Sequence, residues 1–293
     1  RNVHFVSRPF PHFKVAPHQS FRQRLTAAWG LPYHSGLANL LGRYLYYRSA
    51  RALMERKAVS RAEAFIAVSN AAKEEYLAHY DVQPERVQVI HHGIDTRLFR
   101  PRKARAQELR CRLGLEGTSV LLYVGFSTPR KGLEYLAEAL KYLPKDVKLV
   151  IIGRWEAGYR KRFLRALSGA EGRVLELGYV PDEEMPAYYS LADVFILPSL
   201  LEGFGLPLVE AMACGVPVVA AASGSIPEVV GEAGILVPPR EGAALAQAVS
   251  RVLKDASLRH RLQRAGRENV KSRFTRERMV TETLEFYQRV ADN

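Results

Sequence analysis

Cysteine is scarce in this 293-residue chain, and long apolar runs are missing altogether. The two cysteines, Cys111 and Cys214, are too few for a disulfide framework and do not have the spacing of a metal site. No apolar run approaches the roughly 20 residues that a membrane-spanning helix needs. The start of the chain also lacks the basic head, apolar stretch and small-residue cleavage site of a signal peptide. These absences lead us to expect a cytoplasmic protein.

Histidine patterns typical of metal sites are missing as well. The chain has 8 histidines, and His91 and His92 are adjacent, but no pair has the H-x3-H type of spacing that binds zinc. We therefore expect no metal, and a surface or hydrogen-bonded structural role is the default for each histidine.

Acidic residues are outnumbered by basic ones, mostly near the N-terminus. The net charge is +13; residues 1–103 hold 17 Lys and Arg against 7 Asp and Glu (net +10), and the remainder holds 26 against 23 (net +3). This excess favours an anionic partner such as phospholipid or a phosphorylated substrate. The arginine-rich stretch 43–61 could be an interfacial helix or a core helix. We expect no nucleic-acid partner, because no recognised motif is present and aromatic residues do not interleave with the basic ones.

The sequence pattern predicts an α/β fold. From about residue 119, short β-branched runs alternate with helical stretches, which is typical of βαβ units and of a parallel sheet covered on both faces. The predicted strands are 119–126, 147–153, 174–180, 193–199, 217–221 and 234–239. Helices are predicted between them, two more within 241–273, and another at the end of the chain.

A shorter α/β unit precedes this region. Its predicted strands are 3–7, 64–69 and 87–94, with a helix at 71–80 between the last two. Three strands in about 100 residues predict a thin Rossmann-like sheet.

Open parallel sheets bind ligands beyond the carboxyl ends of their strands, so the loops after the strands are the candidate sites. GFSTPRKG (125–132) follows one strand and opens a helix. Arg130 and Lys131 beside that helix start would hold a phosphate well, although the loop is neither a P-loop nor a GxGxxG motif. The alternative is an exposed basic loop without a ligand.

A second loop, SLLEGFGLPLVEAMACG (199–215), places two carboxylates around a glycine-rich turn. Gly203 and Gly205 permit close backbone approach to a ligand at the following helix start. Glu202 and Glu210 could face one cleft, where ionised oxygens accept hydrogen bonds from sugar and ribose hydroxyls. The spacing of the two acids alone is weak evidence, whereas the order Glu-Gly-aromatic-Gly-Leu-Pro is more specific.

A third loop, SGSIPEVVG (223–231), also follows a strand. Its serines stand at a helix start, so we expect them to cap that helix. Contact with a ligand is the alternative.

Three stretches together resemble the C-terminal domain of retaining glycosyltransferases of the GT-B fold, in the family 4 group of mannosyl- and glucosyltransferases. They are ELGYVPDEEMPAYYSLADVFILPS, SLLEGFGLPLVEAMACGVPVVA and IPEVVGEAGILVPP. The resemblance runs from about 119 to 275, and AFIAVSNAAKEEYLAHYDVQPERVQVIHHGIDTRLFRP resembles the end of that family's N-terminal domain and its linker. It implies two Rossmann-like domains with parallel sheets. These would be a short or truncated acceptor-side domain with its linker (1–103) and a nucleotide-sugar-binding domain (104–274). A last helix (275–293) would cross back to the N-terminal domain.

The resemblance also implies an activity. A hexose would pass from a nucleotide-diphosphate sugar to a glycan or lipid-linked acceptor, with retention at the anomeric carbon and without a metal or cofactor. The setting would be envelope, polysaccharide or glycolipid synthesis at the inner face of the membrane, with possible peripheral contact to anionic lipid. The alternatives are an inactive nucleotide-sugar-binding module and a GT-B sugar-nucleotide epimerase.

The site residues that the resemblance implies fall into sets by role. The donor diphosphate would be bound by Gly125, Arg130, Lys131, Gly205 and Leu206. The donor sugar would be bound by Glu202, Gly203, Phe204 and Gly205, with Glu202 also catalytic. The ribose would be bound by Glu210, and the base by Tyr179 and Val180. The active-site histidine of the N-terminal domain has two candidates, His18 and His34.

The sequence departs from the family pattern in three ways. Gly125-Phe126 stands where the family has Gly-Arg, so one phosphate cation is missing and Arg130 is the candidate to replace it. His92-Gly93 stands where the family has Asn-Gly. The family's first strand and glycine-rich loop have no counterpart, so the N-terminal domain is expected to be either short or a fragment.

Overall fold

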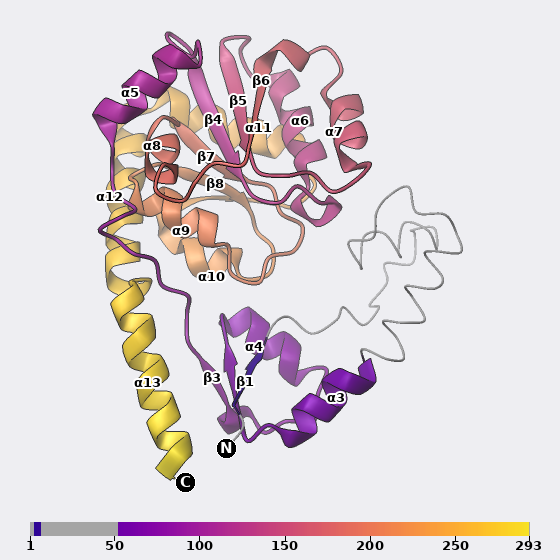
Figure 1. Ribbon diagram of the computed structural model, residues 1–293. Coiled ribbons are helices and arrows are strands. Elements are labelled where there is room, and N and C mark those ends of the chain that lie inside the picture. The colour runs from indigo at the N-terminus through magenta and orange to yellow at the C-terminus, as the bar shows by residue number, and fades with distance from the viewer. Residues whose placement is uncertain (1–2, 7–51, 293) are drawn as a thin grey trace.

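The computed structural model describes residues 3–6 and 52–292, which form two α/β lobes (Figure 1). The smaller N-lobe contains a three-stranded sheet, and the larger C-lobe contains a six-stranded sheet. All strand pairs in both sheets are parallel. The predicted fold class is confirmed.

The N-lobe sheet has the order β1-β2-β3. Its strands are β1 (Val3–Val6), β2 (Ala64–Ala67) and β3 (Val87–Val89), and its helices are α3 (Ala52–Arg61) and α4 (Asn70–Leu77). Phe65 of β2 and Tyr76 of α4 are fully buried and their rings lie 5.4 Å apart, which joins helix to sheet. The helix predicted at 43–61 is described only from residue 52.

The C-lobe sheet has the order β6-β5-β4-β7-β8-β9. Its strands are β4 (Ser119–Val124), β5 (Val147–Ile152), β6 (Val174–Gly178), β7 (Val194–Leu197), β8 (Val218–Ala221) and β9 (Gly234–Val237). The six predicted strands are therefore all present, with slightly shorter ends. In chain order within this lobe the pattern is 3-2-1-4-5-6, the Rossmann arrangement. The topological switch point, where such sheets bind ligands, lies between β4 and β7.

Helices cover both faces of this sheet. Its helices are α6 (Leu133–Tyr142), α7 (Tyr159–Leu167), α8 (Met185–Ser190), α9 (Leu206–Ala213), α10 (Ile226–Val230), α11 (Gly242–Lys254) and α12 (Ala256–Arg273); α5 (Lys103–Arg112) leads into the lobe. Helix α6 buries Leu133, Leu136, Ala137 and Leu140, the spacing of one helical face. It packs with α7 and α11, while α9 packs with α8 and α12.

The chain crosses between the lobes twice, and the two crossings lie side by side. After β3 the chain runs to Ile94, whose N–H donates to the carbonyl of Phe274, while Arg276 N–H donates back to Ile94 (both 2.9 Å). A Cβ at Gly93 would lie 2.2 Å from the carbonyl oxygen of Thr275, so only glycine fits there. Beyond this point α13 (Arg276–Asp292) runs along the N-lobe (Figure 1).

Helix α13 is anchored to the N-lobe by apolar contacts. Its buried Phe286 packs in one cluster with Ile66 of β2 and with Ile90. Among the described residues, no helix has both the length and the apolar character needed to cross a membrane.

Candidate functional site

The two loops at the switch point meet through an ion pair. Lys131 Nζ, from the loop after β4, lies 2.5 Å from Oε2 of Glu202, from the loop after β7. Both side chains are about nine-tenths buried. Arg130 lies beside them. Its Nη1 is 3.9 Å from Glu202 Oε1 and donates a hydrogen bond of 3.1 Å to the carbonyl of Leu201. One carboxylate therefore stands between two cations, and the cluster carries a net positive charge.

Lys131 is held by its place in the fold. Pro129–Lys131 form a single 3-10 turn, and Gly132 follows with φ +65 before α6 begins. A Cβ at Gly132 would lie 2.4 Å from the carbonyl oxygen of Pro198, so the two loops can approach this closely only with glycine there. Burial lowers the pKa of the Lys131 ammonium, and the facing Glu202 carboxylate opposes that shift only in part.

Free backbone donors line the start of α9. Within residues 3–6 and 52–292, the N–H groups of Gly203, Phe204, Gly205 and Leu206 donate to no other protein atom. Gly205 has φ +92 and stands at the N-cap, and Pro207 occupies the first turn, where proline is favoured. Unbonded N–H groups at a helix start favour an anionic or hydroxyl-rich ligand.

The 202–205 loop is held in place through its carbonyl groups. Ser225 Oγ and N–H both donate to the Glu202 carbonyl at 3.2 Å. Ser223 Oγ donates to the Ser199 carbonyl at 2.6 Å. The prediction that these serines cap α10 is wrong, because their hydroxyl hydrogens are directed to carbonyls of the neighbouring loop and neither caps a helix N–H.

Glu210 is positioned by a tyrosine on the neighbouring helix. Tyr189 Oη of α8 donates to Glu210 Oε2 at 2.5 Å. Burial raises the pKa of Glu210, and the hydrogen bond from Tyr189 lowers it in part. The negative charge of Asp182 raises the pKa of Glu210 further. Burial and the nearby Glu210 carboxylate likewise raise the pKa of Tyr189, so its hydroxyl stays a donor.

Three glycines, Gly125, Gly153 and Gly178, lie next to one another across the ends of β4, β5 and β6. Gly153 N–H donates to Gly178 O at 2.7 Å, and a Cβ at Gly153 would lie 2.2 Å from Gly125 O. The backbone therefore carries no side chain at these three positions, where the strands end. The residues that follow two of these glycines, Phe126 and Tyr179, are exposed aromatics, whereas Val180 is buried.

Three buried hydroxyls near the ion pair were not found by sequence reasoning. Tyr123, Ser127 and Thr128 are each at least nine-tenths buried, and their hydroxyl oxygens have no hydrogen-bond partner among the described residues. Burial raises the pKa of Tyr123, the neighbouring Ser127 hydroxyl and the Arg130 charge lower it in part, and the Glu202 carboxylate adds to the rise. The only signal in the sequence was the position of these residues in and just after β4.

A set of contacts between the lobes was also missed. Glu228 of α10 accepts hydrogen bonds from the backbone N–H groups of Asn70 and Ala71 and from Nε2 of His91. Ser69 Oγ donates to the Gly203 carbonyl at 3.0 Å. Helix α4 of the N-lobe therefore begins against the C-lobe, as the facing ends of α4 and α10 indicate in Figure 1.

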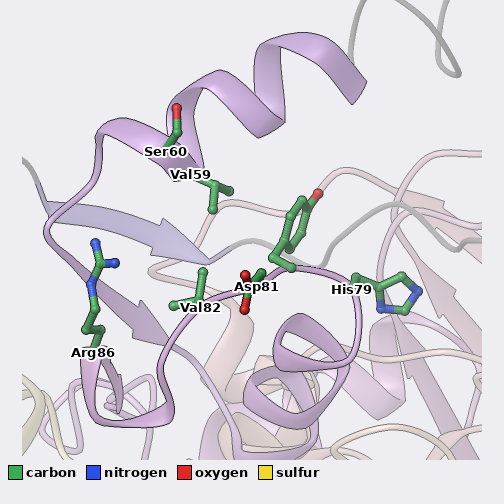
Figure 2. Close-up of a pocket in the computed structure, with 7 residues that line it drawn as sticks. Val59, Ser60, His79, Asp81, Val82 and Arg86 are labelled. Atoms are coloured by element: carbon green, nitrogen blue, oxygen red, sulfur yellow. The ribbon is translucent and has the colours of Figure 1, made fainter.

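The N-lobe contains a separate open pocket of about 370 Å³. Figure 2 shows its lining, with Val59 and Ser60 on α3 and the remaining residues on the segment after α4. Two of its polar side chains are engaged: Arg86 donates to the carbonyls of Ala62 and Glu63, and His79 Nδ1 lies 2.6 Å from the Glu75 carbonyl. We assign no role to this pocket.

The remaining predicted residues lie elsewhere. His18 and His34 fall outside the described residues. His91 has the hydrogen-bonded role expected of a histidine, through Glu228. In the part of the chain that the structure describes, no three His, Cys, Asp or Glu side chains are close enough to share a metal ion.

Comparison with known protein families gives matches over both lobes. The model described as "Glycosyl transferases group 1" matches residues 106–269, and that described as "Glycosyltransferase Family 4" matches residues 6–98.

Individual proteins show the same similarity. The chain is 38% identical to O-antigen chain mannosyltransferase B of Escherichia coli over 57% of its own length and 45% of that protein. It is 31% identical to the MMP alpha-(1->4)-mannosyltransferase of Mycolicibacterium hassiacum over 80% of its length and 56% of that protein. The chain thus spans about half the length of these relatives. The crystal structure of Anabaena HepE in complex with UDP and glucose superposes with a TM-score of 0.75 and 27% identity, over 82% of this chain and 66% of that one.

Proposed function

The chain belongs to the group 1 glycosyltransferases and has their GT-B fold, and from that premise we propose that it transfers a hexose from a nucleoside-diphosphate sugar to a glycan or lipid-linked acceptor. One observation carries the proposal. At the switch point, Lys131 and Arg130 flank Glu202 beside the unbonded N–H groups at the start of α9. Cations and amides together bind a diphosphate through charge-assisted hydrogen bonds.

Each part of the cluster has a role in this proposal. Lys131, Arg130 and the N–H groups of Gly205 and Leu206 bind the diphosphate, and the bare backbone at Gly125 lets it approach. Glu202 and the 203–205 backbone bind the transferred sugar, with Glu202 also acting in catalysis.

The nucleoside is proposed to lie along the ends of β6 and α9. Glu210, already oriented by Tyr189, accepts the ribose hydroxyls, because an ionised carboxylate is a strong acceptor. The base lies against Tyr179 and Val180. The exposed ring of Tyr179 supports this placement, since it offers apolar area at the mouth of the site.

The chemistry follows from where charge develops. Breaking the bond between sugar and diphosphate leaves negative charge on the phosphate and oxocarbenium character on the sugar. Donors that are fixed before the reaction stabilise such charge at the least cost in reorganisation. We infer metal-independent transfer with retention, because Lys131, Arg130 and the α9 amides supply positive charge at the leaving group and Glu202 supplies negative charge beside the sugar. An N-lobe histidine, His18 or His34, completes the site in this proposal.

Two donors are favoured by the comparisons. The HepE structure holds UDP and glucose, and two relatives are named mannosyltransferases. UDP-glucose and GDP-mannose are therefore the first donors to test. The name of the E. coli relative, an O-antigen chain mannosyltransferase, supports a glycan as acceptor.

We also propose peripheral contact with an anionic membrane at its cytoplasmic face. The net charge of +10 within residues 1–103 supports this, because basic surfaces are attracted to anionic lipid headgroups. Salt-sensitive binding to phosphatidylglycerol vesicles is the expected result, and no binding at low salt would remove this part of the proposal.

A thermal-shift screen tests the proposed function. A ligand that binds the native state raises the unfolding temperature by mass action. We expect one of UDP-glucose and GDP-mannose to raise it, and to be hydrolysed slowly. Loss of hydrolysis in Glu202→Ala would support an enzyme, whereas binding without any turnover would favour a non-catalytic nucleotide-sugar-binding module.

A further inference from the structure

We propose that Ser69 and Glu228 form a latch between the lobes that fixes the orientation of the 202–205 loop, and that both are positioning residues for the transferred sugar. The latch is defined by Ser69, Glu228, Asn70 and His91. Its role toward the sugar rests on the proposed function, while the latch itself does not.

Ser69 connects the start of α4 to the opposite lobe with one hydroxyl group. The residue is fully buried, and its Oγ accepts the hydrogen bond of Ala72 N–H at 3.1 Å as the N-cap of α4. Because an N-cap uses only a lone pair of the oxygen, the hydroxyl hydrogen remains available. It is donated to the carbonyl of Gly203 at 3.0 Å.

This donation determines where an N–H group of the loop points. In a trans peptide the C=O of one residue and the N–H of the next point in opposite directions. When Ser69 binds the Gly203 carbonyl, the N–H of Phe204 is directed away from Ser69. Ser225 does the same for the preceding peptide by binding the Glu202 carbonyl, which directs the N–H of Gly203.

The loop needs this external support because Gly203 cannot fix its own conformation. A Cβ built on Gly203 would have no neighbour within 4 Å, so no packing restrains the residue. Glycine also has the widest choice of backbone conformations. The two peptide planes on either side of Gly203 are therefore held by one serine from each lobe.

Glu228 holds Ser69 in position. Its carboxylate accepts hydrogen bonds from Asn70 N at 2.9 and 3.0 Å, from Asn70 Nδ2 at 2.8 Å and from Ala71 N at 3.3 Å. His91 Nε2 lies 2.7 Å from the same carboxylate. A carboxylate at the first turn of a helix satisfies free N–H groups and complements the helix dipole. The residue that follows Ser69 is thus bound to the C-lobe.

Glu228 is itself well placed for this role. It lies on α10, and its own carbonyl accepts a hydrogen bond from Arg273 Nη2 at 2.9 Å. Arg273 ends α12, next to the second crossing between the lobes. The latch therefore connects the start of α4 to the same region of the C-lobe from which the second crossing leaves.

The linker, which is the segment that follows β3 and carries His91 and His92, adds a second contact to the loop. The ring of Phe204 lies 6.0 Å from that of His91 and 5.2 Å from that of His92. Phe204 is buried, so the loop is contacted by α4 through Gly203 and by the linker through Phe204. Movement of the N-lobe away from the C-lobe would break both contacts, and the orientation of the loop amides is thereby coupled to lobe closure.

Donor binding tests the positioning role on the full chain. UDP-glucose and GDP-mannose are compared with UDP and GDP by calorimetry in wild type, Ser69→Ala and Ser69→Thr. Ser69→Ala is expected to weaken binding of the sugar nucleotide about fivefold to tenfold, the loss of one hydrogen bond. Binding of the nucleotide without sugar should stay within twofold, because the 203–204 peptide serves the sugar. Ser69→Thr keeps the hydroxyl and should restore the affinity.

Asp255→Ala is the matched control. Asp255 caps α12 by accepting from Leu258 N–H at 2.9 Å, so this variant loses a helix cap in the other lobe without touching the loop. It should bind both kinds of nucleotide as wild type does. Equal weakening of nucleotide and sugar nucleotide in Ser69→Ala, or no weakening, would overturn the positioning role.

A double-mutant cycle tests the latch without any ligand. Ser69→Ala and Glu228→Ala are expected to be non-additive, with the double variant destabilised by clearly less than the sum, because either change releases the same contact. Strict additivity would overturn the latch. If wild type binds neither donor nor nucleotide, the proposed function fails, while the cycle still decides whether the latch exists.

Discussion

Lys131 Nζ lies 2.5 Å from Glu202 Oε2, although the two residues are 71 positions apart in the chain. The pair joins the loops after β4 and β7, on either side of the switch point. Arg130 stands 3.9 Å from the other oxygen of the same carboxylate. A lysine that already has a fixed partner needs little reorganisation to receive a phosphate oxygen, which is the condition for strong electrostatic stabilisation.

Lys131→Met should lower both stability and donor affinity. The change leaves Glu202 buried without its main partner, so we expect the unfolding free energy to fall by about 2–4 kcal/mol, since Arg130 compensates only in part. Urea unfolding measures this change. Lys141→Met, on the exposed last turn of α6, is the control and should be near neutral. Equal stability of the two variants would contradict a structural ion pair.

Tyr189→Phe should change the pH dependence of nucleotide binding. Burial raises the pKa of Glu210 and the Tyr189 hydrogen bond lowers it, so removing the hydroxyl raises that pKa further. Only the ionised carboxylate accepts strongly from the ribose, and affinity therefore falls as the pH drops through the pKa of Glu210. In Tyr189→Phe this fall should begin at a higher pH. Affinity measured across about pH 5–8 tests the shift.

The neighbouring Tyr188→Phe is the control for this experiment. Tyr188 Oη accepts a hydrogen bond from Arg112 at 3.4 Å. The hydrogen bond to Glu210 comes from Tyr189 and not from Tyr188. Its pH profile should match wild type. Identical profiles in all three proteins would argue against a ribose contact at Glu210.

Gly93→Ala should destabilise the junction between the lobes. The new Cβ would lie 2.2 Å from the Thr275 carbonyl, and the two crossings would have to separate. Overpacking of this kind costs about 1–3 kcal/mol. Gly172→Ala, where a Cβ meets nothing within 4 Å, is the matched control. If Gly93→Ala melts at the same temperature as the wild-type protein, the two crossings do not need their close approach for stability, and the prediction is contradicted.

Glu228→Gln should remove stability that depends on pH. Burial alone would raise the pKa of Glu228, but hydrogen bonds from Asn70, His91 and Ala71 outweigh it and the pKa lies below the ordinary 4.5. A carboxylate with a lowered pKa contributes stability above its unfolded pKa and loses it as the pH falls through the folded pKa. The difference from wild type should be largest near neutral pH and shrink below about pH 4.5. Exposed Glu232→Gln should show no such trend.

The strands of the C-lobe could be predicted because each signal was local. Runs such as 119–126 and 147–153 are nearly continuously apolar, and a loop separates each from a helix with its own periodicity. The two loops that carry Lys131 and Glu202 were also selected by a general rule, because ligand sites lie where parallel strands end. The ion pair between the two residues was not predicted.

Other contacts could not be predicted because their partners lie far apart in sequence. Glu228 binds Asn70 across 158 positions, and nothing in either segment indicates the other. Ser223 and Ser225 stood at a helix start and were expected to cap it, yet the nearest acceptors for their hydroxyl hydrogens are carbonyls of the 199–202 segment. Local preference was overridden there by a neighbour that only the folded chain supplies.

Calorimetric titration of the full chain with UDP-glucose and GDP-mannose tests the central claim most directly. Wild type is expected to bind one of the two, and the Arg130→Ala/Lys131→Met double variant should lose at least about a hundredfold in affinity, the sum of two charge-assisted contacts. Undiminished affinity in the double variant, or no binding of either donor by wild type, would contradict a donor site at the junction of the β4 and β7 loops.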